Sequence, residues 1–218
     1  MRRIVITAFI SLDGIMQAPG GPEEDPTGRF TLGGWTVPFW EGEGAAEMGA
    51  FLDETFGQPF DLLLGRRTYE IFAAHWPKVG PDDPMGALFD RVTKHVAAGP
   101  DTVLSWVNSR ALGADVVGAV RGLKDADGPD LLIQGSSVLV QALLANDLID
   151  EFRLLVFPVL LGPGKTLFGE GTLPAPLRLV RSRTAANGVA MSVYARADGP
   201  IATGSFALAP AQDMDAAP

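Results

Sequence analysis

The chain has 218 residues, no cysteine, 47% hydrophobic and 20% charged residues, and a formal net charge of −9. This composition fits one globular domain with a sizeable core, and it excludes disulfides and thiolate chemistry. The acidic balance argues against a nucleic-acid partner, whose binding surface would be basic. No stretch is long and apolar enough for a membrane span, and no signal-peptide cleavage site follows the first apolar run, so we expect a cytoplasmic protein with no membrane partner.

Strands and helices are expected to alternate along most of the chain. Short apolar runs predict the strands, and apolar residues at helical spacing predict the helices between them. Predicted strands cover residues 3–10, 60–64, 94–98, 102–107, 131–133 and 150–157, and predicted helices cover 45–55 and 114–124, with two more beginning near residues 65 and 136. This alternation predicts an α/β fold with a mostly parallel sheet flanked by helices.

The last part of the chain follows a different pattern. Residues 177–183 and 189–195 are joined through Asn187-Gly188, which is a strong signal for a β-hairpin, so the sheet should end in an antiparallel edge. Residues 199–218 are rich in alanine, proline and glycine without periodicity. We therefore predict one domain over residues 1–198 and a disordered tail over residues 199–218.

A long loop follows the first predicted strand. Residues 17–29 are rich in proline, glycine and acidic side chains, and loops of this length are usually functional or disordered. The acidic residues 23–25 are expected to form a solvated part of it. Trp35 and Trp40 come next, within irregular sequence. This aromatic segment either folds over a pocket or is a surface loop that the two indoles hold in place.

Two glycine turns are the strongest sign of a binding site. Gly135-Ser136-Ser137 ends a buried strand and opens a helix, which Ser136 or Ser137 is expected to cap. Free N–H groups at such a helix start favour phosphate, although many turns of this kind bind nothing. Gly65-Arg66-Arg67-Thr68 repeats the arrangement with two guanidinium groups, which are unfavourable beside the helix dipole unless an anion is near.

Both turns stand at carboxyl ends of predicted strands, where α/β sheets bind ligands. Two phosphate positions at one crevice suit a dinucleotide. Neither turn is a G-x-G-x-x-G fingerprint, which disfavours a standard Rossmann domain. Gly162-Pro-Gly-Lys-Thr166 resembles the end of a P-loop, but Val159 stands where the first glycine would be.

The sequence shows no evident nucleophile and no metal site. His75 and His95 are the only histidines, and their spacing is not that of metal ligands. No G-x-S-x-G motif occurs. Pockets for phosphates and aromatic rings without a nucleophile indicate an enzyme whose cofactor carries the chemistry.

Several stretches together resemble one known family. They are Phe9-Ile-Ser-Leu-Asp-Gly14, Leu63-Leu-Gly-Arg-Arg-Thr-Tyr-Glu70 with Trp76-Pro77, Gly135-Ser-Ser-Val-Leu139, and Leu148-Ile-Asp-Glu-Phe-Arg-Leu154 followed by Pro158-Val-Leu-Leu-Gly-Pro-Gly-Lys165. In this order they resemble the dihydrofolate reductase-like superfamily, in the branch of the riboflavin-biosynthesis reductase C-terminal domain. The resemblance covers roughly residues 2 to 197.

The resemblance implies a dihydrofolate reductase-like twisted sheet, NADPH as hydride donor and a homodimer. It implies that Asp13 and Gly14 lie beside the nicotinamide and the substrate. It also implies a set of residues that meet the cofactor's phosphates, namely Gly65, Arg66, Arg67, Thr68, Gly135, Ser136, Ser137, Val138 and Leu139.

The chain departs from the family pattern at two places. Gly99 and Pro100 stand where the family usually carries a Ser/Thr-Arg pair for the 2′-phosphate, which leaves that phosphate to Arg66 and Arg67. True dihydrofolate reductases have a carboxylate on the first helix, and an ungapped count places Gly49 there, with Glu47 nearby. Without that carboxylate a pterin would lose a charge-assisted bond of roughly 1.5–3 kcal/mol, which argues against dihydrofolate as substrate.

We therefore predict an NAD(P)H-dependent reductase that transfers hydride to a small heterocyclic substrate. Asp13 is expected to orient the substrate or relay a proton, and Trp40 and Glu47 to contact it. Two alternatives stay open. One is the 5-amino-6-(5-phosphoribosylamino)uracil reductase of riboflavin biosynthesis, and the other is a non-catalytic nucleotide-binding protein of the same fold.

Overall fold

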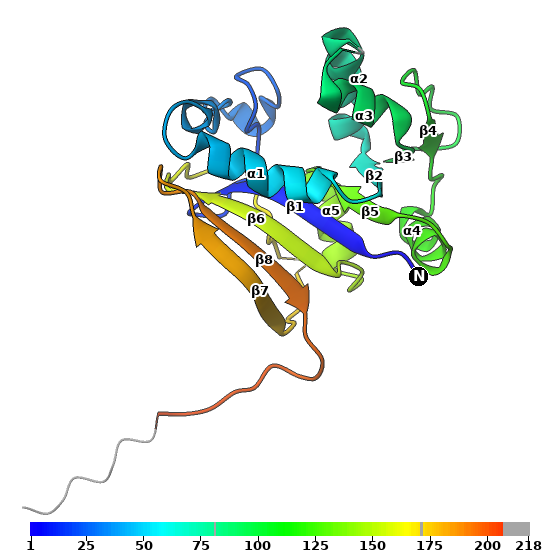
Figure 1. Cartoon of the computed structure of the whole chain (residues 1–218). Helices are drawn as coiled ribbons and strands as arrows, with labels where there is room; N and C mark the ends of the chain where they lie inside the picture. Colours follow the sequence, from blue (N-terminus) through cyan, green and yellow to red (C-terminus); the bar gives the residue numbers. More distant parts are fainter. Residues whose placement is uncertain (81, 171, 207–218) are drawn as a thin grey trace, which may run out of the picture.

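The computed structural model describes residues 1–80, 82–170 and 172–206, and its centre is an eight-stranded sheet (Figure 1). The strands lie in the order β4-β3-β2-β5-β1-β6-β8-β7. Their bounds are β1 (Ile4–Ser11), β2 (Phe60–Gly65), β3 (Lys94–Ala97), β4 (Ser109–Ala111), β5 (Asp130–Ile133), β6 (Glu151–Phe157), β7 (Leu177–Thr184) and β8 (Ala190–Arg196). The helices are α1 (Ala45–Phe56), α2 (Arg66–Val79), α3 (Pro84–Arg91), α4 (Val116–Asp125) and α5 (Ser137–Leu144).

All neighbouring strands from β4 to β6 pair in parallel, whereas β8 pairs antiparallel with both β6 and β7. The predicted mostly parallel sheet with a C-terminal antiparallel hairpin is therefore confirmed. Strand β1 lies between β5 and β6, and its apolar run is buried because helices cover both faces of the sheet there.

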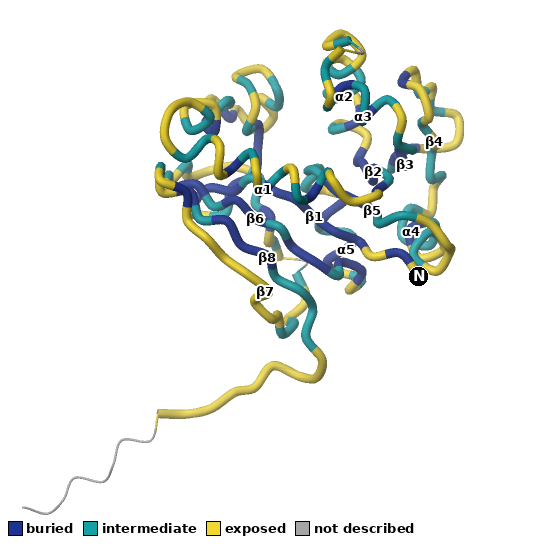
Figure 2. The backbone as a smooth tube through the Cα atoms, viewed as in Figure 1, coloured by how far each residue is buried: buried dark blue, intermediate teal, exposed yellow. Residues whose placement is uncertain are grey.

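The two faces of the sheet carry different helices. Successive side chains of β1 alternate between the faces, so that Ile4 and Ile6 pack with α4 and α5, while Val5 packs in the cluster that includes residues of α2 and α3. Helix α1 covers β6 and β8 on the same face as α2 and α3 (Figure 1). The sheet is buried at its centre and exposed along β7, as Figure 2 shows. A binding cavity can therefore form where the α1–α3 face meets the carboxyl ends of the strands.

One prediction about secondary structure is wrong, and one helix was missed. Residues 102–107 form no strand. Trp106 is buried there and its backbone N–H donates to the Tyr69 hydroxyl at 2.9 Å, so no neighbouring strand takes that bond. The edge strand β4 follows instead, after Asn108 turns the chain with a positive φ of 57°. Helix α3 was not predicted, and Asp83 caps it by accepting hydrogen bonds from the backbone of Met85 and Gly86.

The predicted tail is described only in part. Residues 199–206 contain no helix or strand, and residues 207–218 lie outside the described residues, so its disorder stays a prediction. Among the described residues, no helix combines the length and the apolarity that crossing a bilayer requires. The homodimer implied by the family resemblance likewise stays a prediction.

Candidate active site

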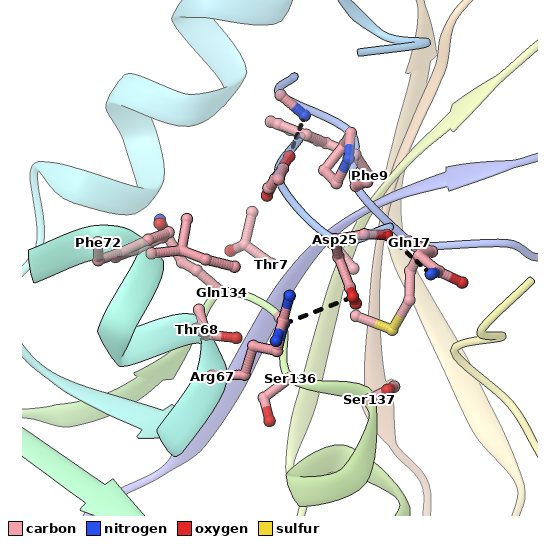
Figure 3. A pocket seen from close by; sticks show the side chains of 18 of the residues that line it. Thr7, Phe9, Gln17, Asp25, Arg67, Thr68, Phe72, Gln134, Ser136 and Ser137 are labelled. Carbon is pink, nitrogen blue, oxygen red and sulfur yellow. Dashed lines mark hydrogen bonds and ion pairs between the residues drawn. The ribbon is translucent and has the colours of Figure 1, made fainter. Parts of the chain in front are cut away.

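A cavity of about 530 Å³ opens at the carboxyl ends of the central strands (Figure 3). Its walls come from β1, from helices α1, α2 and α3, from the loop at residues 16–25, from the turn between β5 and α5, and from residue 165. The starts of helices α2 and α5 contribute to this cavity, and so do several aromatic side chains. Both glycine turns singled out in the sequence contribute to it.

The two turns touch because β2 and β5 are neighbouring parallel strands. Gly65 ends β2 and begins α2, and a Cβ atom added to it would lie 1.7 Å from Oγ of Ser136. Gly65 therefore permits the close approach of the two turns. Neither α2 nor α5 has a side-chain cap at its first residue, which leaves backbone N–H groups available to an anion.

The predicted capping of α5 by Ser136 or Ser137 is wrong. Ser136 occupies the N-cap position, but its backbone is left-handed, with φ 77° and ψ 87°, and its side chain lies against Gly65. The hydroxyl therefore cannot accept from the second or third N–H of the helix, as a capping serine does. Both Ser136 and Ser137 line the cavity instead.

Only one of the two arginines at the start of α2 faces the cavity. Arg67 and Thr68 line it, while Arg66 has a side chain that is 63% exposed and donates from Nε to Oε1 of Glu70 at 2.9 Å. Consecutive helical residues point about 100° apart, so Arg66 and Arg67 leave α2 in different directions. The pairing with Glu70 spans four residues on the solvent side of the helix.

Arg67 belongs to a charge cluster that the sequence did not reveal. Its Nε lies 3.5 Å from Oδ1 of Asp25 (Figure 3). Oδ2 of Asp25 accepts a hydrogen bond from Nζ of Lys165 at 2.5 Å. The Asp25 side chain is only 13% exposed, so the expectation of a solvated acidic stretch is wrong for this residue. Glu24 also lines the cavity, and burial raises the pKa of its carboxyl.

Gln17 holds the loop in place over the cavity. Its buried side-chain amide donates to the backbone oxygens of Asp25 at 2.9 Å and Thr27 at 2.8 Å, and its Oε1 accepts from the backbone N–H of Lys165 at 3.0 Å. Trp35 Nε1 donates to the Gln17 backbone oxygen at 2.8 Å. One buried side chain thus joins the acidic loop to the segment at residue 165.

The tryptophan segment has features of both hypotheses, a segment that folds over a pocket and a loop held in place by its indoles. Trp35 is buried against the Phe157 ring, with ring centroids 5.3 Å apart, and holds the loop in place. Trp40 lines the cavity and lies 5.7 Å from the Phe9 ring, so the segment also contributes a wall. The contact of Trp40 with a ligand stays a prediction.

The Asp25 cluster makes a testable contribution to stability. Burial alone would raise the pKa of Asp25, but hydrogen bonds from Lys165 and Thr27 outweigh it and hold the pKa below its ordinary value of 3.8. The charged Asp25 carboxylate therefore stabilises the folded state fully above about pH 4, and this stabilisation is lost as the pH falls through the lowered pKa. We expect Asp25→Asn to lower the melting temperature by about 2–4 °C at pH 7 and by much less at pH 3.

Thermal unfolding at both pH values, followed by circular dichroism, measures this difference. Glu23→Gln is the matched control, because Glu23 is exposed in the same loop and loses the same charge. An equal loss for both variants at pH 7 would show that net charge, rather than the contacts of Asp25, is responsible.

Asp13 lies outside the lining of the cavity. Its carboxylate accepts hydrogen bonds from Oγ of Ser11 at 2.5 Å and from the backbone N–H groups of Gly162 at 2.7 Å and Leu161 at 3.1 Å. The Ser11 hydrogen bond, together with these N–H groups, lowers the pKa of Asp13. The geometry gives Asp13 a structural role at the 161–162 turn, and its catalytic role stays a prediction.

Four other predicted residues also lie outside the lining. Leu139 is buried in the core beneath α5, whereas its neighbour Val138 is 79% exposed and lines the cavity. Glu47 accepts a hydrogen bond from the backbone of Ala186 at 2.8 Å, in the hairpin turn. Gly14 and Gly65 support turns without facing the cavity themselves. Gly135 lines it, and its contact with a pyrophosphate stays a prediction.

The aromatic part of the cavity was not recognised in the sequence as part of the site. Phe56 of α1, Phe72 and Trp76 of α2, and Met85 and Phe89 of α3 line it. The spacing of Phe72 and Trp76 is that of one helix face, and this pattern is the usual signature of a packed core. Helix α3, which completes the wall, gave no clear signal of its own.

Comparisons with known proteins show the family and the fold. The family model described as the RibD C-terminal domain matches residues 2–191. Two Bacillus subtilis proteins, both uncharacterized, are similar in sequence. YyaP is 25% identical over 199 residues, covering 88% of this chain and 94% of YyaP, and YwjB is 32% identical over 181 residues, covering 82% of this chain and 89% of YwjB.

Two solved structures share the fold. A protein from Shewanella sp. PV-4, provisionally assigned to riboflavin biosynthesis, superposes with a TM-score of 0.59 at 19% identity, covering 90% of this chain and 99% of that one. Dihydrofolate reductase from Enterococcus faecalis, complexed with NADP(H) and RAB-propyl, gives a TM-score of 0.55 at 16% identity and coverages of 90% and 97%. The fold is thus dihydrofolate reductase-like, and the chain belongs to the family of RibD C-terminal domains.

Proposed function

We propose that this protein is an NADPH-dependent reductase that transfers hydride to a small heterocyclic substrate. One observation carries the proposal. Two uncapped helix starts meet beside Arg67 and Thr68 in a cavity that aromatic side chains also line. Such a cavity suits a ligand with a charged pyrophosphate and flat rings.

The residues present fit this cofactor. The backbone N–H groups after Gly65 and Ser136 would hold the pyrophosphate, and Arg67 and Thr68 would add charged and neutral hydrogen bonds. A preference for NADPH over NADH would depend on Arg66 and Arg67, because Gly99 and Pro100 offer no side-chain donor. When bound, the cofactor supplies a hydride, and water supplies the proton that completes addition across a C=N or C=C bond.

The protein's own residues would bind and orient the cofactor and the substrate, and they would exclude water from both. The loop held by Gln17 covers the cavity, and Trp40 and Phe9 lie in contact beside it. Positioning two reactants side by side in such a cavity would favour hydride transfer, and it requires no protein nucleophile.

The family match favours one alternative function, that of the reductase that acts on 5-amino-6-(5-phosphoribosylamino)uracil. That substrate carries a phosphate, which would need a cation in the cavity besides those that meet the cofactor. The lining side chains of α1, of α3 and of α2 beyond its first turn are uncharged, among them Phe72 and Trp76. We therefore rank this reaction second.

The proposal is tested by titrating the protein with NADPH and with NADH. Binding is measured from the quenching of tryptophan fluorescence. Binding of NADPH, together with transfer of deuterium from labelled cofactor to a reduced heterocycle, is the expected result. Failure of either cofactor to bind at millimolar concentration would contradict it. Tight binding without oxidation by a panel of heterocycles would favour a non-catalytic nucleotide-binding protein.

A further inference from the structure

Two adjacent carboxyl groups of the loop line the cavity in opposite environments. Asp25 has two cationic neighbours, Arg67 and Lys165, whereas Glu24 forms no ion pair with any described residue. Burial, together with the charge of Asp25, raises the pKa of Glu24, while the hydrogen bonds to Asp25 hold its pKa below the ordinary value. Two carboxyl groups whose environments separate their pKa values in this way are typical of an active site in which one is the acid and the other stays charged.

The carboxyl group of Glu24 is held in place and remains accessible. The backbone N–H of Gly20 donates to its Oε2 at 2.5 Å, and the backbone N–H of Glu24 donates to the oxygen of Gly21 at 3.2 Å, which closes a turn. The other oxygen, Oε1, has no hydrogen-bond partner among the described residues and is not buried. A ligand in the cavity can therefore reach a carboxyl group whose position the turn has already fixed.

The other lining side chains offer no comparable acid. Within the described residues, the remaining charged groups that line the cavity are Asp25, Arg67 and Lys165, and no histidine or tyrosine lines it. Asp25 is kept charged by its cationic neighbours, and the ammonium group of Lys165 is engaged by Asp25. A guanidinium group does not release a proton in proteins. Glu24 is thus the lining group best suited to donate a proton near neutral pH.

We infer that Glu24 is a catalytic residue, which donates a proton to the nitrogen of a ring C=N bond in the substrate. The inference rests on the proposed function and names its acid. The O–H bond of Glu24 breaks and an N–H bond forms, which gives an iminium ion paired with the Glu24 carboxylate. The iminium carbon takes the hydride, and the π electrons become the lone pair of the amine. The substrate gains the two electrons that the nicotinamide cofactor loses, and Glu24 regains a proton from water.

Binding of a ring imine without cofactor tests the contact. The probe is ¹⁵N-labelled 3,4-dihydroisoquinoline, whose nitrogen signal moves far upfield when the nitrogen is protonated. The measurement is made at a pH well above the pKa of the free iminium ion, so that the free probe is neutral. We expect the wild type to bind the probe as its iminium ion, because the Glu24 carboxylate then pairs with the new charge.

Glu24→Gln tests the residue itself. The amide oxygen can still accept from the backbone of Gly20, so the turn should persist, and thermal unfolding should show no loss of stability at pH 7. We expect the upfield signal to disappear and the probe to bind about 10-fold more weakly. Glu23→Gln is the matched control, because it removes the same charge from an exposed position in the same loop and should change neither result.

Turnover gives a second measurement, with 3,4-dihydroisoquinoline as substrate and NADPH in excess. Glu24→Gln should lower kcat about 100-fold while leaving the Kd for NADPH unchanged. The kcat of the wild type should fall as the pH rises through the pKa of Glu24, because only the acid form donates a proton. Glu24→Gln should lack this pH dependence, which a residue with a purely structural role would not alter.

The contrary results are distinct. A probe that binds the wild type as the neutral imine, that fails to bind at millimolar concentration, or that is reduced equally fast by Glu24→Gln would overturn the role of Glu24. If NADPH binds but the imine is neither protonated nor reduced, the inference fails and the proposed reductase stands. If the imine is protonated but NADPH does not bind, the reductase fails, and the site would be one that binds cyclic imines.

Discussion

Replacing Arg67 with alanine is expected to weaken NADPH binding by about 10- to 100-fold, because a charged hydrogen bond to phosphate contributes roughly 1.5–3 kcal/mol. Arg67 lines the cavity beside the two helix starts, where the pyrophosphate would lie. Calorimetric titration at two salt concentrations measures the loss. The salt dependence of binding should also decrease in the variant, since one cation fewer meets the phosphates.

Arg66→Ala is the matched control, with the same side chain removed one position away. Arg66 lies outside the cavity and pairs with Glu70, so its loss should change affinity for NADH little and affinity for NADPH by less than the loss of Arg67. Equal losses of NADPH affinity in the two variants would show that Arg66 leaves Glu70 to contact the cofactor. No loss in Arg67→Ala would place the phosphates elsewhere.

A methyl group on Gly65 should both destabilise the protein and disrupt the cofactor site. In Gly65→Ala the new Cβ would lie 1.7 Å from Oγ and 2.4 Å from Cβ of Ser136, so the turn before α5 must move. Overpacking of this kind typically costs about 1–3 kcal/mol. We expect that loss in the free energy of unfolding, measured by urea denaturation, together with at least a 10-fold loss of NADPH affinity.

A second substitution makes this test specific. Ser136→Gly removes both clashing atoms and suits the positive φ of 77° at that position, so the double variant Gly65→Ala/Ser136→Gly should regain most of the stability. Gly49→Ala in α1, where no atom lies within 4 Å of the added Cβ, should be neutral or stabilising. If the double variant were no more stable than Gly65→Ala, the contact with Ser136 would not be the cause.

The sequence predicts the fold well where local pattern and burial agree. Short apolar runs such as Leu131–Ile133 allow little but a strand buried on both faces, and Asn187-Gly188 fixes the hairpin. It fails at the sheet edge. Residues 102–107 have strand-like composition, but Trp106 is anchored to Tyr69 and Asp90, and the three-residue strand β4 is too short to show periodicity.

The residues of the candidate site also differ in how far the sequence predicts them. The glycine turns and Arg67 are local patterns, so the sequence reveals them, although choosing between Arg66 and Arg67 requires the phase of the helix. Asp25 and Lys165 meet only after the chain has folded, because they are far apart in sequence and neither belongs to a motif that predicts the contact.

The position of β1 bears on how the protein is synthesised. This strand lies near the start of the sequence, but both of its neighbours in the sheet belong to residues 130–157, and the loop that follows it is fastened to residue 165. While the ribosome works toward those residues, an apolar strand with two open edges has no partner. Parallel pairings between distant segments form slowly, so we expect the nascent chain to be prone to aggregation and to depend on chaperones until β6 has emerged.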